Sequence, residues 1–172
     1  KNTRESLKYD DDYYWEYSKA YVNGEKTSLT VAYDADKAAT DTVLKTGVLY
    51  KALKSIEDGK YITEVKQVAL ANLPVNAVGD DAFWLTVNPT KTVKYDCDEE
   101  TVFVLVEYTD KGKLDTISAG NIGDMFTDKD DDGFQTLVSV VKDANDHNTA
   151  RLVYITYTKP APAPVKYTVN AK

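Results

Sequence analysis

Residue types that build reactive sites are scarce in this chain. It has one cysteine, Cys97, which excludes an internal disulfide, and one histidine, His147, so a histidine base has a single candidate. Acidic residues outnumber basic ones by 28 to 21, the net charge is −7, and no segment gathers Lys and Arg. This charge balance disfavours nucleic acid and anionic lipid surfaces as partners.

Long hydrophobic runs are also missing. The longest uninterrupted apolar stretch covers residues 102–106, which is far below the ~20 residues of a membrane-spanning helix. It predicts a buried strand, and we expect no membrane insertion. The chain begins at Lys1 with no signal-peptide pattern, so we expect any export signal to lie upstream in a longer product.

Strand-forming patterns fill the remaining sequence. The turn dipeptides Asn23-Gly24 and Asp58-Gly59 each stand between runs of alternating or β-rich residues, which is typical of β-hairpins. The segment 47–53 fits a helix or a strand, and its place before Asp58-Gly59 favours a strand. The 13 tyrosines suit half-buried pleated surfaces with one wet end.

The second half of the chain carries the stronger strand signals. Residues 101–108 predict a central strand, and residues 134–141 and 150–157 predict a hairpin joined by the polar turn 145–148. Short helical turns are expected near residues 36–39 and after Ser118, a plausible N-cap. With turn signals every 8–12 residues, the sequence predicts an all-β fold, mainly an antiparallel barrel or sandwich, with about nine strands and at most two short helices.

The domain organisation follows from composition. Residues 1–12 are charged and poor in aliphatics, which indicates a disordered lead-in, and residues 13–158 form a single β-rich domain with a possible sub-boundary near 88–92. Alternating prolines make residues 159–164 a semi-rigid linker. Residues 165–172 are then a tail or the start of a following module.

One acidic segment resembles a metal-binding loop. Asp128, Asp130 and Asp132, followed by Gly133, match the first half of an EF-hand calcium loop. The second half does not match, because Ser139 stands where a bidentate glutamate is needed. A looser Ca²⁺ site and a solvated acidic loop both remain open, and the missing half favours the solvated loop. No other cofactor is expected.

Two aromatic groups are candidates for ligand binding. Tyr13, Trp15 and Tyr17 alternate along one predicted strand and share a face, whereas Tyr14 takes the opposite face. Trp84 lies in a second aromatic segment. Aromatic faces on a sheet stack on sugar rings, but large aromatic side chains also build cores, and the core interpretation is favoured here.

No catalytic constellation accompanies these groups. Neighbouring carboxylates should raise the pKa of the Cys97 thiol and suppress its thiolate, so a structural role is expected for this residue. His147 lies in a polar turn, where histidines are usually solvated. We find no phosphate loop, nucleophile elbow or Cys/His metal spacing, and the sequence therefore predicts that the chain is not an enzyme.

Several short segments together suggest a family. They are Gly47-Val48-Leu49-Tyr50 with Asp58-Gly59-Lys60-Tyr61-Ile62-Thr63, Tyr95-Asp96 with Thr101-Val102-Phe103-Val104, Ile117-Ser118 with Ile122, and Ala150-Arg151-Leu152-Val153-Tyr154-Ile155. With these segments the chain resembles the β-rich repeat modules of large bacterial cell-surface proteins that also carry S-layer homology domains. Cys97 departs from the pattern, because such modules usually have a residue other than cysteine there.

The resemblance implies a secreted protein held at the cell wall or cell surface through other domains, with a spacer, display or adhesion role for this module. Its expected partners are neighbouring modules of the same polypeptide, and cell-wall or host glycans or proteins. The leading expectation is a non-enzymatic structural or interaction module. A carbohydrate-binding module using surface aromatics is the alternative, and a hydrolase domain is a distant third.

Overall fold

The structure is a computed structural model that describes residues 4–9, 12–22, 25–33 and 44–160. This part of the chain is all-β and sandwich-like without forming a closed barrel, which confirms the predicted fold class. It contains twelve strands, where the sequence predicts about nine, and one short 3₁₀ helix, η2 (Ile122–Asp124). No helix within the described ranges is long and apolar enough to cross a bilayer.

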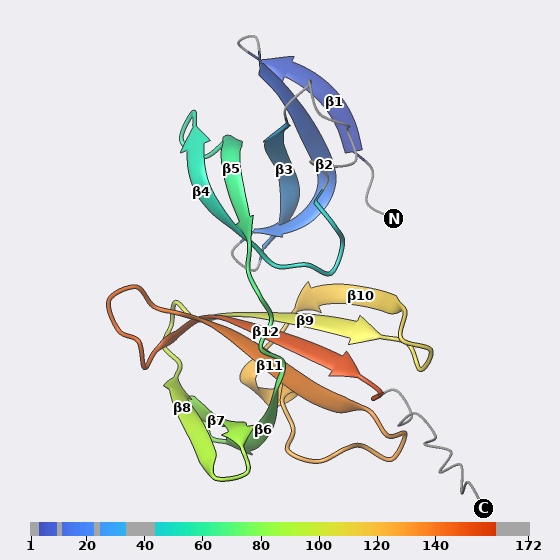
Figure 1. The fold of residues 1–172 in the computed structure, drawn as a ribbon, viewed down its shortest axis with the longest axis vertical. Helices are drawn as coiled ribbons and strands as arrows, with labels where there is room; N and C mark the ends of the chain where they lie inside the picture. The colour runs from blue at the N-terminus through green and yellow to red at the C-terminus, as the bar shows by residue number, and fades with distance from the viewer. Residues whose placement is uncertain (1–3, 10–11, 23–24, 34–43, 161–172) are drawn as a thin grey trace, which may run out of the picture.

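The strands form two sheets that divide the chain in sequence (Figure 1). The five-stranded sheet has the order β1-β2-β3-β5-β4 and consists of β1 (Arg4–Tyr9), β2 (Asp12–Val22), β3 (Glu25–Tyr33), β4 (Tyr50–Ile56) and β5 (Tyr61–Gln67). The seven-stranded sheet has the order β10-β9-β12-β11-β6-β7-β8 and consists of β6 (Leu73–Val78), β7 (Ala82–Asn88), β8 (Lys91–Asp96), β9 (Val102–Tyr108), β10 (Leu114–Ala119), β11 (Gln135–Lys142) and β12 (Ala150–Thr158).

Hairpins predicted from local signals are confirmed. β2 pairs antiparallel with β3, β4 with β5, and β11 with β12. In the β4–β5 turn Glu57, Asp58 and Gly59 all have positive φ, with Gly59 at 87°, a conformation that glycine adopts without strain. The ambiguous segment 47–53 therefore contributes a strand. The Asn23-Gly24 turn, residues 36–39 and the tail 165–172 lie outside the described residues.

Three details differ from the sequence predictions. Part of the expected lead-in 1–12 is strand β1, which pairs with β2. A short helical turn does follow Ser118, at η2, but its N-cap is Asn121, because Ile117 and Ser118 pair with β9 as part of β10. Residues 88–92 are no boundary, because they contain the tight turn between paired strands β7 and β8, and the sheets divide instead at residues 68–72.

The seven-stranded sheet has a complete core of its own. It curls so that β6, β7 and β8 lie below β9, β11 and β12 in Figure 1. Phe83, Leu85, Val138, Val153 and Ile155 are each at most 1% exposed and pack together between these two layers. Burial of this apolar surface is the main stabilising contribution to this half of the molecule.

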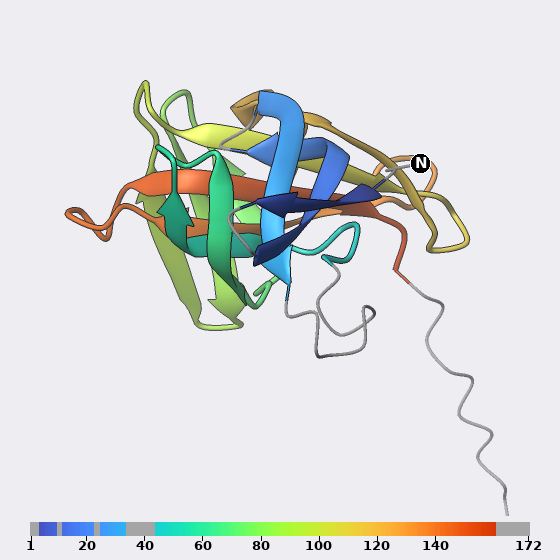
Figure 2. The same ribbon diagram turned by 90° about the horizontal axis from the view of Figure 1, so that it is seen from above.

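The five-stranded sheet stands with one end on the outer face of the seven-stranded sheet. Figures 1 and 2, which differ by a quarter turn, show the strands of the upper sheet rising from the layer formed by β9, β10 and β12. The residues just before β4 and the segment between β5 and β6 cover part of this face, where Leu49 and Leu70 pack against it and the Tyr154 hydroxyl donates to the carbonyl of Gly47 at 2.8 Å.

Candidate functional site

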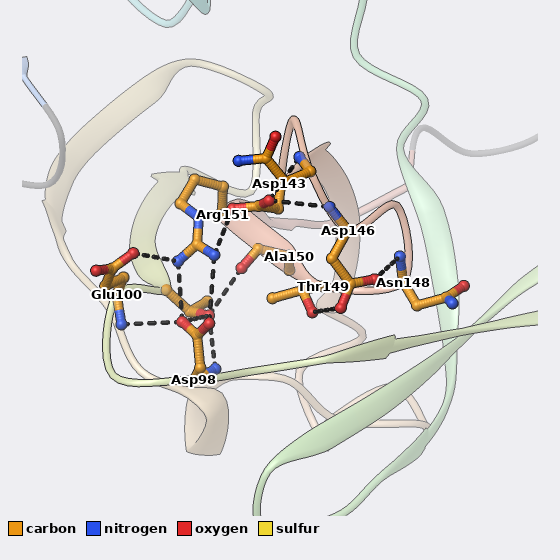
Figure 3. Close-up of polar contacts among 10 residues, drawn as sticks. Asp98, Glu100, Asp143, Asp146, Asn148, Thr149, Ala150 and Arg151 are labelled. Carbon is orange, nitrogen blue, oxygen red and sulfur yellow. Dashed lines mark hydrogen bonds and ion pairs between the residues drawn. The ribbon is translucent and has the colours of Figure 1, made fainter.

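An ion-pair cluster around Arg151 is the most developed polar site of the described residues (Figure 3). The guanidinium donates to both carboxylate oxygens of Asp98, with Nη1–Oδ1 at 2.9 Å and Nη2–Oδ2 at 3.2 Å. It also donates from Nε to Asp143 Oδ2 at 2.8 Å, and its Nη1 lies 3.4 Å from Glu100 Oε2. Arg151 is the second residue of β12, and its side chain connects the turn before β9 with the turn before β12.

The turn between β11 and β12 folds around its own aspartates. Asp143 Oδ1 accepts from the backbone amides of Asn145 at 2.8 Å and Asp146 at 3.0 Å. Asp146 in turn accepts from the amide of Asn148 and from the Thr149 hydroxyl, both at 3.0 Å. Hydrogen bonds of this kind, from an aspartate side chain to nearby backbone amides, are typical of turns. They hold the conformation of the loop without a bound ligand.

The turn before β9 is anchored in a similar way. Asp98 Oδ1 accepts from the amide of Glu100 at 2.9 Å, and the Thr101 hydroxyl donates to the carbonyl of Ala150 at 2.7 Å. The amide of Asp96 donates to the carbonyl of Asn148 at 2.8 Å. The two turns are thus joined by the Thr101 hydroxyl and by a backbone hydrogen bond as well as by Arg151.

The electrostatics of the cluster favour its charged form. The hydrogen bond from Arg151 is the largest effect that holds the pKa of Asp98 below its usual range. For Asp143, the amide of Asn145 lowers the pKa most, followed by Arg151. The same carboxylates raise the pKa of Arg151. All three groups therefore stay ionised at neutral pH, and neither aspartate is poised to exchange a proton as a general acid or base.

The three aspartates of the predicted calcium loop do not form a metal site, and Asp130 has partners within the protein. Asp130 Oδ1 accepts from the amides of Asp132 at 3.0 Å and Phe134 at 2.9 Å, while its Oδ2 accepts from the Tyr157 hydroxyl. Within the described ranges, no group of three or more His, Cys, Asp or Glu side chains is arranged to hold a metal ion. The structure thus does not bring Asp128, Asp130 and Asp132 together as ligands, and Asp130 stabilises the loop itself.

The aromatic residues of β2 are mostly packed. As predicted, Tyr13, Trp15 and Tyr17 share a face: Tyr13 and Trp15 both contact the ring of Tyr33, and Trp15 packs with Tyr17 in the core of this sheet. Trp15 stacks on Tyr33 with the ring centroids 4.7 Å apart. Only Tyr13 is exposed, at 38%.

Trp84 is far from this group. It lies on β7 in the other sheet, and Figure 1 places β2 and β7 on opposite sides of the layer formed by β9, β11 and β12. The ammonium of Lys94 sits 5.5 Å from the centroid of its ring. Trp15 and Trp84 therefore do not form one flat platform, although each was a candidate for ligand binding.

Cys97 and His147 lie near the same end of the seven-stranded sheet. Burial, together with Asp96, Asp81 and Asp98, raises the pKa of the Cys97 thiol to about 11, which agrees with the expectation of an inert residue. His147 is exposed in the β11–β12 turn. Neither residue enters the Arg151 cluster.

The sequence did not predict the Arg151 cluster. Asp98 and Arg151 are 53 residues apart, and only the parallel pairing of β9 with β12 brings their turns together. The run of Asp and Asn residues at 143–148 was a signal for a turn but carried no information about its partner. Comparisons with protein-family models, curated proteins and solved structures give no match.

Proposed function

We propose that the chain is a non-enzymatic structural module of a secreted, cell-wall-associated bacterial protein, which spaces or displays its neighbours at the cell surface. One observation carries the proposal. The strand that leads into the proline-rich segment 159–164, β12, is an inner strand of its sheet, held on one side by β9 and on the other by β11. A linker that leaves from such a strand is anchored where a sheet is hardest to open.

The ladders around β12 are long. Its pairing with β11 runs from Gln135–Thr158 to Lys142–Ala150, and its pairing with β9 runs from Leu152–Val102 to Tyr157–Glu107. Tension along β12 loads both ladders in shear, so many hydrogen bonds must break together. The same strand carries Val153 and Ile155, both fully buried, and their exposure would add to the cost of extraction.

The hydrogen bonding of the aspartates also favours a structural module over an enzyme. Asp98, Asp143 and Asp130 are each bound to a side chain of β12 and to backbone amides of their own turns, which leaves them no evident role in acid–base chemistry. Carbohydrate binding has less support, because Trp15 and Trp84 belong to different sheets.

Single-molecule force spectroscopy tests the proposal directly. The full chain, pulled from its two ends, should unfold in two events, with the five-stranded sheet yielding at low force and the seven-stranded sheet at a clearly higher force. Forced unfolding reports the unfolding barrier, which is the property relevant to a module under tension. Two events at equally low force would remove the basis of the proposal.

A second pulling geometry provides the control. In a Cys97→Ser background, Asp131→Cys and Pro160→Cys place handles just outside the paired ends of β11 and β12, since Gln135 lies opposite Thr158. Tension between these handles unzips the same ladder one bond at a time. The unzipping force should be several times lower than the force in shear, and similar forces in both geometries would contradict the mechanical argument.

A further inference from the structure

The surface between the two sheets is apolar on both sides without forming a shared core. The five-stranded sheet buries Tyr17, Val31 and Ile62 in its own cluster. The outer face of the seven-stranded sheet carries a separate cluster built on Val104, Val106 and Tyr154. The two clusters have no residue in common, and at the edge of the second cluster Val102 and Leu152 remain only partly buried.

A cleft follows this contact. Its main chamber has a volume of about 860 Å³ and continues into a smaller one of about 320 Å³, and both are lined by Tyr21, Tyr50 and Ala52 of the five-stranded sheet. Val102, Val104 and Leu152 contribute the opposite wall of the main chamber. Clefts of this size and apolar character are typical of sites for small organic ligands.

Charged side chains of both signs line the cleft, and two of them are lysines. Lys51 from β4 and Lys142 from β11 line the main chamber on opposite sheets. Among the ion pairs and cation–π contacts found for the described residues, neither lysine takes part. Arg151 and Glu100, which also line it, are already bound to each other.

This pair of lysines stands out against its surroundings. Residues 73–160 contain 16 acidic and 8 basic side chains, so this half of the protein repels anions in general. A polyanion would be repelled by this negative potential over a large surface. A ligand with a single negative charge and an apolar body would instead place its charge beside the lysines and its body on the valines.

We propose that the cleft between the sheets binds an elongated amphipathic anion, of which a free long-chain carboxylate is the simplest form. Its apolar chain lies on the wall formed by Val102, Val104 and Leu152, and its carboxylate is neutralised by Lys51 and Lys142, one from each sheet. Binding thereby fills the cleft and links the two halves of the molecule. The site is independent of the mechanical role proposed above.

Isothermal titration of the full chain with sodium dodecanoate tests this assignment, with dodecyltrimethylammonium as a cation of the same chain length. We expect saturable binding of one dodecanoate per chain and at least tenfold weaker binding of the cation. The double variant Lys51→Gln/Lys142→Gln should weaken dodecanoate binding about fivefold, in line with two partly exposed charge contacts. Lys91→Gln, which alters an exposed lysine of β8, should leave it unchanged.

The body of the ligand is tested separately. Ala52→Trp places a large ring in the cleft from an exposed position on an edge strand, so it should abolish binding while the circular dichroism spectrum stays that of the wild type. In the wild type, methyl resonances of Val102, Val104 and Leu152 should shift on titration, with no change at Val78 and Val87, which are exposed apolar residues elsewhere.

Three results would overturn the proposal: no saturable binding at millimolar dodecanoate, equal binding of the anion and the cation, or shifts spread over Val78 and Val87. Vesicles of phosphatidylglycerol distinguish a free amphiphile from a lipid surface. Binding to vesicles without binding to dodecanoate would assign the lysines to a membrane and would also overturn it.

Discussion

The Arg151 side chain connects the turn before β9 with the turn before β12 through Asp98 and Asp143. Replacing it by methionine keeps the aliphatic stem but leaves Asp98 and Asp143 facing each other without a cation. We expect a lower melting temperature at pH 7 for Arg151→Met, measured by differential scanning calorimetry. Lys111→Met, a charge removal in the exposed loop after β9, is the matched control and should change little.

The same residues predict an acid dependence. The pKa values of Asp98 and Asp143 lie below those of the unfolded chain, which are near 3.9 for aspartate. Their stabilisation is therefore complete above about pH 4 and is lost as the pH falls through the folded-state values. Denaturation curves between pH 6 and 2 should show a steeper loss of stability for the wild type than for Arg151→Met, and parallel curves would contradict this.

Tyr157 should make the stability depend on pH in the alkaline range. Its hydrogen bond to Asp130, with smaller effects of burial and nearby carboxylates, raises its pKa to about 12. A raised tyrosine pKa gives stability that is complete below the unfolded-state pKa, near 10, and is lost as the pH rises toward 12. Urea unfolding between pH 9 and 11.5 should therefore show a smaller loss of stability for Tyr157→Phe than for the wild type. Part of the loss should remain in the variant, because the pKa of Tyr154 is also raised to about 12.

At the scale of the element, the β4–β5 hairpin depends on its turn. Gly59 has φ of 87° and no heavy atom within 4 Å of where a Cβ would lie. In Gly59→Ala the added methyl group meets no neighbouring atom, so the only cost is that of holding alanine at a positive φ. We expect a loss of about 1 kcal/mol in the free energy of unfolding. Gly59→Asn should lose less, because asparagine tolerates positive φ. Equal losses for the two variants would point to a different cause.

The inner strand β12 should be the most sensitive of the described strands. Ile155 is fully buried in the core of the seven-stranded sheet, whereas Val87 at the end of β7 is 43% exposed. Ile155→Ala should lower the free energy of unfolding by about 2–5 kcal/mol, and Val87→Ala by less than about 0.5 kcal/mol. Chemical denaturation monitored by tryptophan fluorescence measures both.

The elements show which part of the fold the sequence can predict. Hairpins were predictable because turn residues and alternating runs lie next to each other, as at Asp58-Gly59. The parallel pairing of β9 with β12 was not, because Val102 and Leu152 are 50 positions apart and nothing local encodes their register. The error at Ser118 has a similar origin: a capping residue favoured a helix, but pairing with Leu105 in β9 outweighs that preference.

The candidate sites divide in the same way. The shared face of Tyr13, Trp15 and Tyr17 followed from strand periodicity and is confirmed. The exposure of Trp15 could not be predicted in this way, because it depends on stacking with Tyr33 of the neighbouring strand β3. The spacing of Asp128, Asp130 and Asp132 suggested metal ligands, but one hydroxyl from Tyr157 and two amides engage Asp130. A motif gives the residue types, and the tertiary fold decides what surrounds them.

At the scale of the whole molecule, the division at residues 68–72 predicts partial autonomy. The seven-stranded sheet has its own core, so a fragment of residues 68–160 should fold alone, with a cooperative thermal transition and dispersed amide resonances. Removing the five-stranded sheet uncovers Val104 and Tyr154, which are 6% and 4% exposed in the full chain. The fragment should therefore bind an apolar dye more strongly than the full chain, and an unfolded fragment would contradict the prediction.

The position of β12 also bears on how the protein is made. A chain synthesised from its N-terminus produces β9 and then β11 before residues 150–158, and the strand that belongs between them is the last of the described strands to be made. Until then two valine-rich strands have open edges, which is a hazard for association between nascent chains. This sheet can therefore be completed only when its final strand is present. A synthetic peptide of residues 150–158 should restore folding to chains that stop before Ala150.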